Sequence, residues 1–164
     1  MMRVEQIMTR NVWTCSPGDS LSAAAQVMWE SDCGCVPIVE HDEDGSRVIG
    51  IITDRDVCMA GYTQGRPLSA IRVESAMARQ VRSCRATDSI AEALNMLRQH
   101  QLHRLPVVDN GDHLVGMLSL ADAAREAARE HGRKGRDVTD TRIGEVLEAI
   151  CEPRAPHGVA ATAI

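Results

Sequence analysis

Apolar side chains recur in the first third of the chain at two spacings that alternate. Residues 21–28 carry them at the spacing of an α-helix, and Ser20 just before can cap that helix. Two short apolar runs follow, 36–39 and 48–52, separated by a polar turn, and they predict a β-hairpin. With a short extended segment before the first helix and a second helix near Asp56, the pattern predicts a β-α-β-β-α unit.

The same pattern occurs a second time. Met8 and Met77 lie 69 positions apart, and this offset holds as far as the hairpin. The second hairpin turn is three residues shorter, so the offset becomes 66 and pairs Asp56 with Asp122. A constant offset with one change at a turn indicates an internal duplication.

We therefore predict an α/β (α+β) fold of two tandem repeats, residues 4–59 and 73–125. One unit is too small to bury its own sheet, so the repeats should pack sheet-to-sheet with pseudo-twofold symmetry. Residues 60–72 contain Gly61, Gly65 and Pro67 and are predicted to be a linker.

The chain after the second repeat is predicted to be a helical extension over residues 126–151 and a flexible tail over 152–164. The helix near Asp122 should reach about His131. A last helix should begin at a cap provided by Asp140 or Thr141 and run to Ile150.

Composition narrows the class of partner. The net charge is −5, Phe is absent, and Trp and Tyr together number three. Nucleic-acid binders are expected to carry a basic face and, for single strands, aromatic rings, so this class is disfavoured. No apolar stretch approaches the ~20 residues of a membrane span, and the N-terminus has no apolar signal region, so we expect a cytoplasmic protein with no membrane partner.

Three segments resemble the motifs of CBS domains. They are Val-Glu-Gln-Ile-Met-Thr (4–9), Gly-Ile-Ile-Thr-Asp-Arg-Asp (50–56) and His-Arg-Leu-Pro-Val-Val-Asp (103–109). The resemblance covers about residues 4–125 in tandem, and the layout is similar to small stand-alone bacterial CBS pairs. It implies two clefts related by the pseudo-twofold axis, which bind AMP, ADP, ATP or another adenosyl compound, and it implies a homodimer.

The residue types agree with that implication. A nucleotide cleft needs a carboxylate for the ribose hydroxyls, donors for phosphate and an apolar slot for adenine. Asp122 suits the ribose because its two oxygens can accept from both hydroxyls. Ser119 lies three residues earlier, at a strand-to-helix junction that favours an anion. His103 and Arg104 match the phosphate-contacting pair of the family, and Arg can bind a phosphate through two parallel hydrogen bonds.

The resemblance also indicates which segments meet. It assigns to the main cleft Thr9, Thr14, Cys33, Cys35, Val36, His103, Arg104, Ser119 and Asp122. Adenine would lie against Val36 and the strand near Thr14. The opposite cleft is assigned Ser83, Thr53, Arg55 and Asp56. We expect it to be weaker because Gly34 and Cys35 stand where the second repeat has His103 and Arg104.

Two of these signals have simpler interpretations. Thr53-x-x-Asp56 and Ser119-x-x-Asp122 both fit a capping box, which needs no ligand. Cys33-Gly34-Cys35 could suggest zinc, but the spacing is C-x-C and no second ligand pair follows, so we expect no metal and no cofactor.

The six cysteines are expected to be mostly buried thiols in a reducing compartment. Cys15 and Cys151 are the exception. If the last helix folds back over the N-terminal segment, their sulfurs could form a disulfide, as the resemblance to a stand-alone family member suggests.

The sequence thus predicts a regulatory module that senses an adenosine-containing nucleotide and signals to an unknown downstream protein. The alternative is a ligand-free structural or stress-response dimer that acts through protein contacts. An enzyme is disfavoured because the sequence has no evident nucleophile–base pair, metal cluster or P-loop. Two chains would pair through the repeat helices, including Met28, Trp29 and the face of Leu94 and Leu97.

Overall fold

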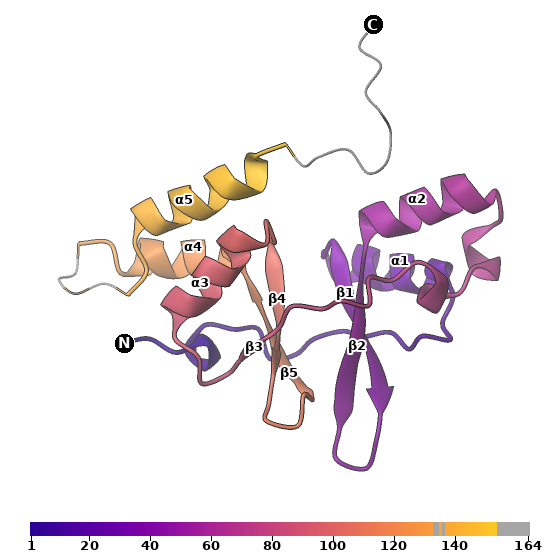
Figure 1. The fold of residues 1–164 in the computed structure, drawn as a ribbon, viewed down its shortest axis with the longest axis horizontal. Helices are drawn as coiled ribbons and strands as arrows, with labels where there is room; N and C mark the ends of the chain where they lie inside the picture. Colours follow the sequence, from indigo (N-terminus) through magenta and orange to yellow (C-terminus); the bar gives the residue numbers. More distant parts are fainter. Residues whose placement is uncertain (133–134, 136, 154–164) are drawn as a thin grey trace, which may run out of the picture.

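The computed structural model describes residues 1–132, 135 and 137–153, and two sheet-containing halves lie side by side in it (Figure 1). The first half contains α1 (Leu21–Glu30), β1 (Cys35–His41), β2 (Ser46–Thr53) and α2 (Asp54–Gln64). The second half contains β3 (Cys84–Arg85), α3 (Ile90–Gln99), β4 (Arg104–Val108), β5 (Leu114–Ser119) and α4 (Leu120–Arg129). A last helix, α5 (Asp140–Cys151), packs on α3 and α4. The predicted α/β architecture with a C-terminal helix is confirmed.

Side-chain caps set the starts of the helices. The Ser20 and Ser89 hydroxyls accept from the backbone N–H groups three residues later, both at 3.2 Å, and so begin α1 and α3. For α5 the cap is Thr139, whose hydroxyl accepts from the Arg142 N–H at 3.3 Å. The sequence placed this cap at Asp140 or Thr141, one or two residues too late.

Other element boundaries also differ from prediction. Strand pairing before α1 and α3 involves Cys15 and β3 rather than residues 12–14 and 81–83, because the chain reaches the neighbouring strand only there. Helix α2 continues to Gln64, so the first residues of the predicted linker are helical. Helix α4 begins at Leu120 and ends at Arg129. Most of the predicted flexible tail lies outside the described residues.

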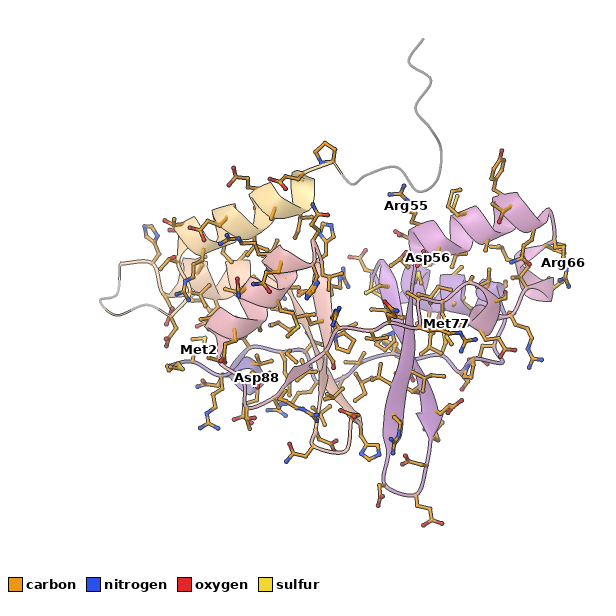
Figure 2. The ribbon with its side chains drawn as sticks, in the orientation of Figure 1. Met2, Arg55, Asp56, Arg66, Met77 and Asp88 are labelled. Atoms are coloured by element: carbon orange, nitrogen blue, oxygen red, sulfur yellow. The ribbon has the colours of Figure 1, made fainter. Side chains whose placement is uncertain are left out.

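The two halves exchange their N-terminal segments. A 3₁₀ turn at Val4–Gln6 packs on the second half, where the Val4 N–H donates to Asp88 O (3.0 Å). Thr9 and Met117 then exchange two backbone hydrogen bonds of 2.9 and 2.8 Å. Residues 73–78 do the same on the first half, and Figure 2 shows Met77 among side chains of that half.

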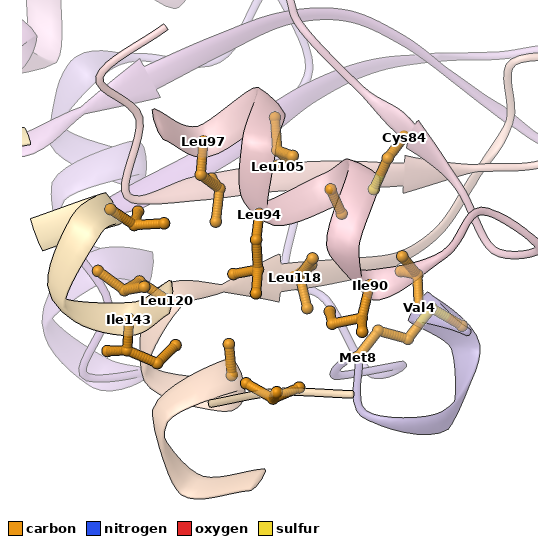
Figure 3. Close-up of a cluster of buried hydrophobic side chains, with 14 of the residues drawn as sticks. Val4, Met8, Cys84, Ile90, Leu94, Leu97, Leu105, Leu118, Leu120 and Ile143 are labelled. Atoms are coloured by element: carbon orange, nitrogen blue, oxygen red, sulfur yellow. The ribbon is translucent and has the colours of Figure 1, made fainter. Parts of the chain in front are cut away.

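The two hydrophobic cores reflect this exchange. Val4 and Met8 belong to the core of the second half, together with α3, β4, β5, α4 and α5 (Figure 3). Gly116 allows the exchange, because a Cβ there would lie 2.7 Å from Met8 Sδ and 2.9 Å from Thr9 O. The equivalent glycine of the first half, Gly50, faces Met77 in the same way.

Helix α5 makes the halves unequal. Its residues Ile143 and Val146 are buried in the core that contains Leu94 and Leu97. Leu94 is 2 % exposed and Leu97 is fully buried. The predicted use of these two side chains for dimer contact is therefore wrong, because α5 already covers them.

Candidate functional site

A cavity of about 340 Å³ lies between the two halves. Six of the nine residues predicted for the main cleft line it: Thr9, Cys33, Cys35, Arg104, Ser119 and Asp122. The exchange of N-terminal segments explains why residues of both repeats line one cavity, because the backbone bridge between Thr9 and Met117 places Thr9 beside the end of β5. Polar groups from both repeats therefore face one space.

Asp122 and Ser119 form a complete capping box at the start of α4. Asp122 Oδ2 accepts from the Ser119 N–H (2.8 Å) and from the Ser119 hydroxyl (2.6 Å). In return the Asp122 N–H donates to Ser119 Oγ (3.1 Å). The capping interpretation is thus confirmed. It does not exclude a ligand, since one carboxylate oxygen is enough for the cap.

The second oxygen of Asp122 has a partner that the sequence analysis missed. Asp122 Oδ1 accepts from the Arg125 guanidinium, one helical turn further along α4. The carboxylate is 6 % exposed, whereas the Arg125 side chain is 66 % exposed. Arg125 also lines the cavity. Its three-residue spacing from Asp122 is the signal that would have identified it.

Arg104 is the other cation in the cavity. It begins β4 and stands opposite Ser119 in the antiparallel register. It also lies beside Cys35. Burial raises the pKa of the Cys35 thiol, while the charge and hydrogen bond of Arg104 act in the opposite direction. Arg104, Ser119 and Asp122 thus bring a cation, a hydroxyl and a carboxylate to the end of one hairpin.

Three predicted main-cleft residues do not line the cavity. Val36 is fully buried in the core of the first half, so the predicted contact of its side chain with adenine is wrong. His103 is exposed, and its role in the structure is a backbone one, since its carbonyl accepts from the Leu120 N–H (2.9 Å). Thr14 is half-buried and lies outside the lining.

Other residues take part instead. Val12 and Trp13 line the cavity, and the Trp13 side chain is 67 % exposed. The remaining lining residues that the sequence analysis did not identify are Asn11, Ser31, Asp32 and Met117. Trp13 thus adds an exposed aromatic ring to the lining of the cavity.

The opposite cleft has the same cap, but Cys35 stands at the position equivalent to Arg104. Asp56 Oδ2 accepts from the Thr53 N–H (2.9 Å) and hydroxyl (2.7 Å). The position equivalent to Arg125 is Met59, at the offset of 66. Arg55 is exposed and extends outward from the start of α2 (Figure 2). Ser83 is half-buried directly before β3, and its place in this cleft stays a prediction of the resemblance.

The cysteines are free thiols. Cys15 is buried in the first half, and burial raises the pKa of its thiol to about 11. Cys151 is exposed at the end of α5, which packs on the second half. The predicted Cys15–Cys151 disulfide is therefore wrong, because Cys15 lies in the core of the first half whereas α5 packs on α3 and α4 of the second half.

The comparison with known families decides the identity of the repeats. The model of the CBS domain matches residues 4–62 and 73–129. The chain is a tandem pair of CBS domains. Within the described residues, no helix is long and apolar enough to cross a membrane, and no group of three or more His, Cys, Asp or Glu can hold a metal ion.

Relatives of this CBS pair match it over most of their length. Hypoxic response protein 1 of Mycobacterium tuberculosis is 32 % identical over 155 residues, which cover 94 % of this chain and 98 % of the relative. The uncharacterized protein YlbB of Bacillus subtilis is 31 % identical over 148 residues, covering 90 % and 97 %.

Solved structures share the fold. That of hypoxic response protein I with two coordinated zinc ions is 33 % identical, with a TM-score of 0.67 and coverage of 76 % and 98 %. The CBS pair of protein MJ0100, in complex with 5′-methylthioadenosine and S-adenosyl-L-methionine, is 25 % identical, with a TM-score of 0.65 and coverage of 76 % and 98 %. CBSX2 in complex with AMP is 22 % identical, with a TM-score of 0.68 and coverage of 79 % and 98 %, and shows the fold alone.

Proposed function

We propose that this CBS pair is a regulatory module, not an enzyme, whose cavity binds an adenosine-containing nucleotide in the cytoplasm. The observation that carries the proposal is the cavity itself, where Thr9 of one repeat faces Arg104, Ser119 and Asp122 of the other. A ligand that touches both repeats stabilises one arrangement of the two, and a downstream protein can recognise that arrangement. The adenosyl ligands of the MJ0100 pair support this ligand class.

Each part of the ligand has a partner in the cavity. Asp122 accepts from the ribose hydroxyls through Oδ1, after the exposed Arg125 side chain turns away from that oxygen. Arg104 and Arg125 donate to phosphate. Adenine lies against Val12 and the ring of Trp13, since a flat aromatic surface favours stacking.

The charges of the cavity favour AMP over ATP. Two cations, Arg104 and Arg125, face two carboxylates, Asp32 and Asp122. If Asp122 is engaged by the ribose, two guanidinium groups remain for phosphate. The oxygens of a single phosphate group can each accept hydrogen bonds from these two guanidinium groups. A triphosphate brings further charges with no partner among these four residues.

Thermal unfolding with AMP, ADP, ATP and S-adenosylmethionine tests the proposal. A ligand present at about 100 times its dissociation constant stabilises the fold by about 2.7 kcal/mol. We expect AMP to give the largest shift. Asp122→Asn should remove it, and the matched change Asp56→Asn in the opposite cleft should leave it intact.

The result distinguishes two functions. No shift with any of these ligands favours the alternative, a ligand-free homodimer in a stress response, which takes its support from the name of the mycobacterial relative. An equal response of the Asp122→Asn and Asp56→Asn variants would disprove the assignment of the site.

A further inference from the structure

Asp122 is a buried carboxylate whose two oxygens are both engaged by the protein itself. Its Oδ2 accepts from the Ser119 N–H and hydroxyl, and its Oδ1 accepts from the Arg125 guanidinium. A carboxylate at a buried position needs a cation or several hydrogen bonds to compensate for the loss of water around it. Arg125 is the cation that fills this need.

Arg125 thereby holds the oxygen that a ribose would use. The cap occupies Oδ2 of Asp122, so a ligand has to approach Oδ1. Ribose hydroxyls can bind that oxygen only after they displace the guanidinium. The exchange replaces a charge-assisted hydrogen bond by hydrogen bonds from neutral donors, which are about half as strong. A ligand that offers only hydroxyl groups at this position is therefore bound weakly.

The displaced guanidinium stays within reach of the same cavity. Arg125 is itself a lining residue, and its side chain is 66 % exposed, so it can change its rotamer without disturbing the core. A phosphate group on the ligand can accept from the displaced Arg125 and restore a charge-assisted hydrogen bond to it. The loss at Asp122 is thus compensated when the ligand is a nucleotide, and it is not compensated when the ligand is a nucleoside.

The first repeat shows that the helix cap does not require this arginine. Thr53 and Asp56 form the same capping box at the start of α2, where Figure 2 labels Asp56. At the offset of 66, Met59 stands where the second repeat has Arg125. A thioether has no hydrogen to donate to a carboxylate. The ion pair with Arg125 is therefore a property of the main cavity and not of the cap.

We propose that Arg125 is a specificity-determining residue, whose ion pair with Asp122 makes the cavity select adenine nucleotides over nucleosides that lack a phosphate. The ion pair is exchanged only when one ligand brings both a ribose for Asp122 and a phosphate for Arg125. The inference rests on the function proposed above, since it concerns the same cavity. It adds that Arg125 competes with the ribose as well as contacting the phosphate.

Calorimetric titration of the full chain with AMP and with adenosine tests this inference. The parent protein should bind AMP at least about 30-fold more tightly than adenosine. Arg125→Met introduces the residue type of the first repeat and keeps a good helix former at an exposed position, so the fold should be kept. This variant should bind AMP at least about fivefold more weakly and adenosine at least about threefold more tightly. Titrations of AMP in the presence of adenosine measure the weaker affinities.

The opposite signs of the two changes separate the exchange from a simple phosphate contact. An arginine that only contacted phosphate would strengthen AMP binding and have no effect on adenosine, which has no phosphate. Arg129→Met is the matched control. Arg129 pairs with Glu126 at 3.4 Å with the same three-residue spacing on α4, and neither residue lines the cavity. The control should leave both affinities unchanged.

Three outcomes would overturn the inference while the proposed function stands. The first is an adenosine affinity that Arg125→Met leaves unchanged or lowers. The second is equal affinity of the parent for AMP and adenosine. The third is an equal effect of Arg125→Met and Arg129→Met on both ligands. If neither ligand binds to the parent, the proposed function itself is wrong, and the inference is wrong with it.

Discussion

Ser119 and Asp122 cap helix α4 and also line the cavity, and Asp122 uses a different carboxylate oxygen for each. The carboxylate holds the first turn of α4 through Oδ2 and presents Oδ1 at the cavity. Both functions need an acidic residue three positions after a hydroxyl, so the sequence alone left the two interpretations open. Thr53 and Asp56 form the same cap without equivalents of Arg104 and Arg125, and therefore provide an internal control.

Removing each hydroxyl should separate the two functions. Ser119→Ala and Thr53→Ala each remove one helix cap, so each should lower the free energy of unfolding by about 1 kcal/mol. Only Ser119→Ala should also weaken AMP binding. Urea denaturation and calorimetry measure the two effects. If Thr53→Ala weakens AMP binding as much, the two clefts are equivalent and our ranking of them is wrong.

His113 links the hairpin tips of the two repeats. Its Nε2 lies 3.1 Å from Asp42 Oδ1 of the first hairpin, and its Nδ1 lies 3.4 Å from Asp109 Oδ1 of its own. The hydrogen bond with Asp42 raises the pKa of His113 above its usual value, against the opposing effect of burial. The hydrogen bond that the backbone N–H of His113 donates to Asp109 Oδ1 lowers the pKa of the Asp109 carboxyl. Folding thus favours the protonated imidazolium of His113 more than the unfolded chain does.

This pair predicts a pH dependence of stability. Folding raises the pKa of His113. Its contribution to the free energy of unfolding is therefore fully present below the pKa of the unfolded state, and it is lost as pH rises through the pKa of the folded state. The stability difference between the parent and His113→Gln should therefore shrink from pH 5.5 to pH 8, about the range in which histidine titrates. Urea midpoints across this range measure it, with His100→Gln, at an exposed position, as the control. A difference that is constant with pH would contradict the assignment.

Among the elements, α5 distinguishes the two repeats most clearly. The sequence predicted this helix from a capping residue, although it placed the cap at Asp140 or Thr141 and not at Thr139. It did not predict where the helix packs, since the same apolar stripe could cover either repeat or a second chain. In the structure α5 contacts α3 and α4, and the Arg98–Glu145 pair and the Gln101 hydrogen bond fix its position.

Two substitutions on α5 should differ sharply in effect. Ile143 is 8 % exposed and Leu147 is 46 % exposed. Ile143→Ala removes buried methylene groups and should cost about 2–4 kcal/mol of unfolding free energy. Leu147→Ala should cost less than about 1 kcal/mol. Chemical denaturation of both variants measures this, and equal losses would show that α5 does not pack as described.

Errors at the level of elements have local causes. The strand before each first helix pairs over only one or two residues, which is too short to leave a periodic pattern in the sequence. Val36 was assigned to the cleft beside Cys35, but successive side chains of a strand point to opposite faces. Cys35 faces the cavity, so Val36 faces the core. The helical and hairpin patterns, which extend over eight residues or more, were assigned correctly.

At the scale of the whole molecule, the duplication made the fold predictable. The residues that line the cavity could be predicted only in part. The offset between repeats identifies equivalent positions and hence the pseudo-twofold arrangement. The cavity, however, also depends on the path of residues 9–13 between the repeats. Asn11, Val12 and Trp13 lie on that path, outside both helices and strands, where hydrophobic periodicity carries no information.

The exchange of N-terminal segments bears on how the protein responds to a break in its chain. Val4 completes one core and Val73 the other, each from the opposite repeat. A single cut between Gly65 and Arg66, at an exposed stretch, should therefore yield two pieces that still elute together from a gel-filtration column and melt in one transition. Separate elution of two folded pieces would show that the repeats are autonomous. Neither fragment, made alone, should fold, because each hydrophobic core lacks a segment that the other fragment carries.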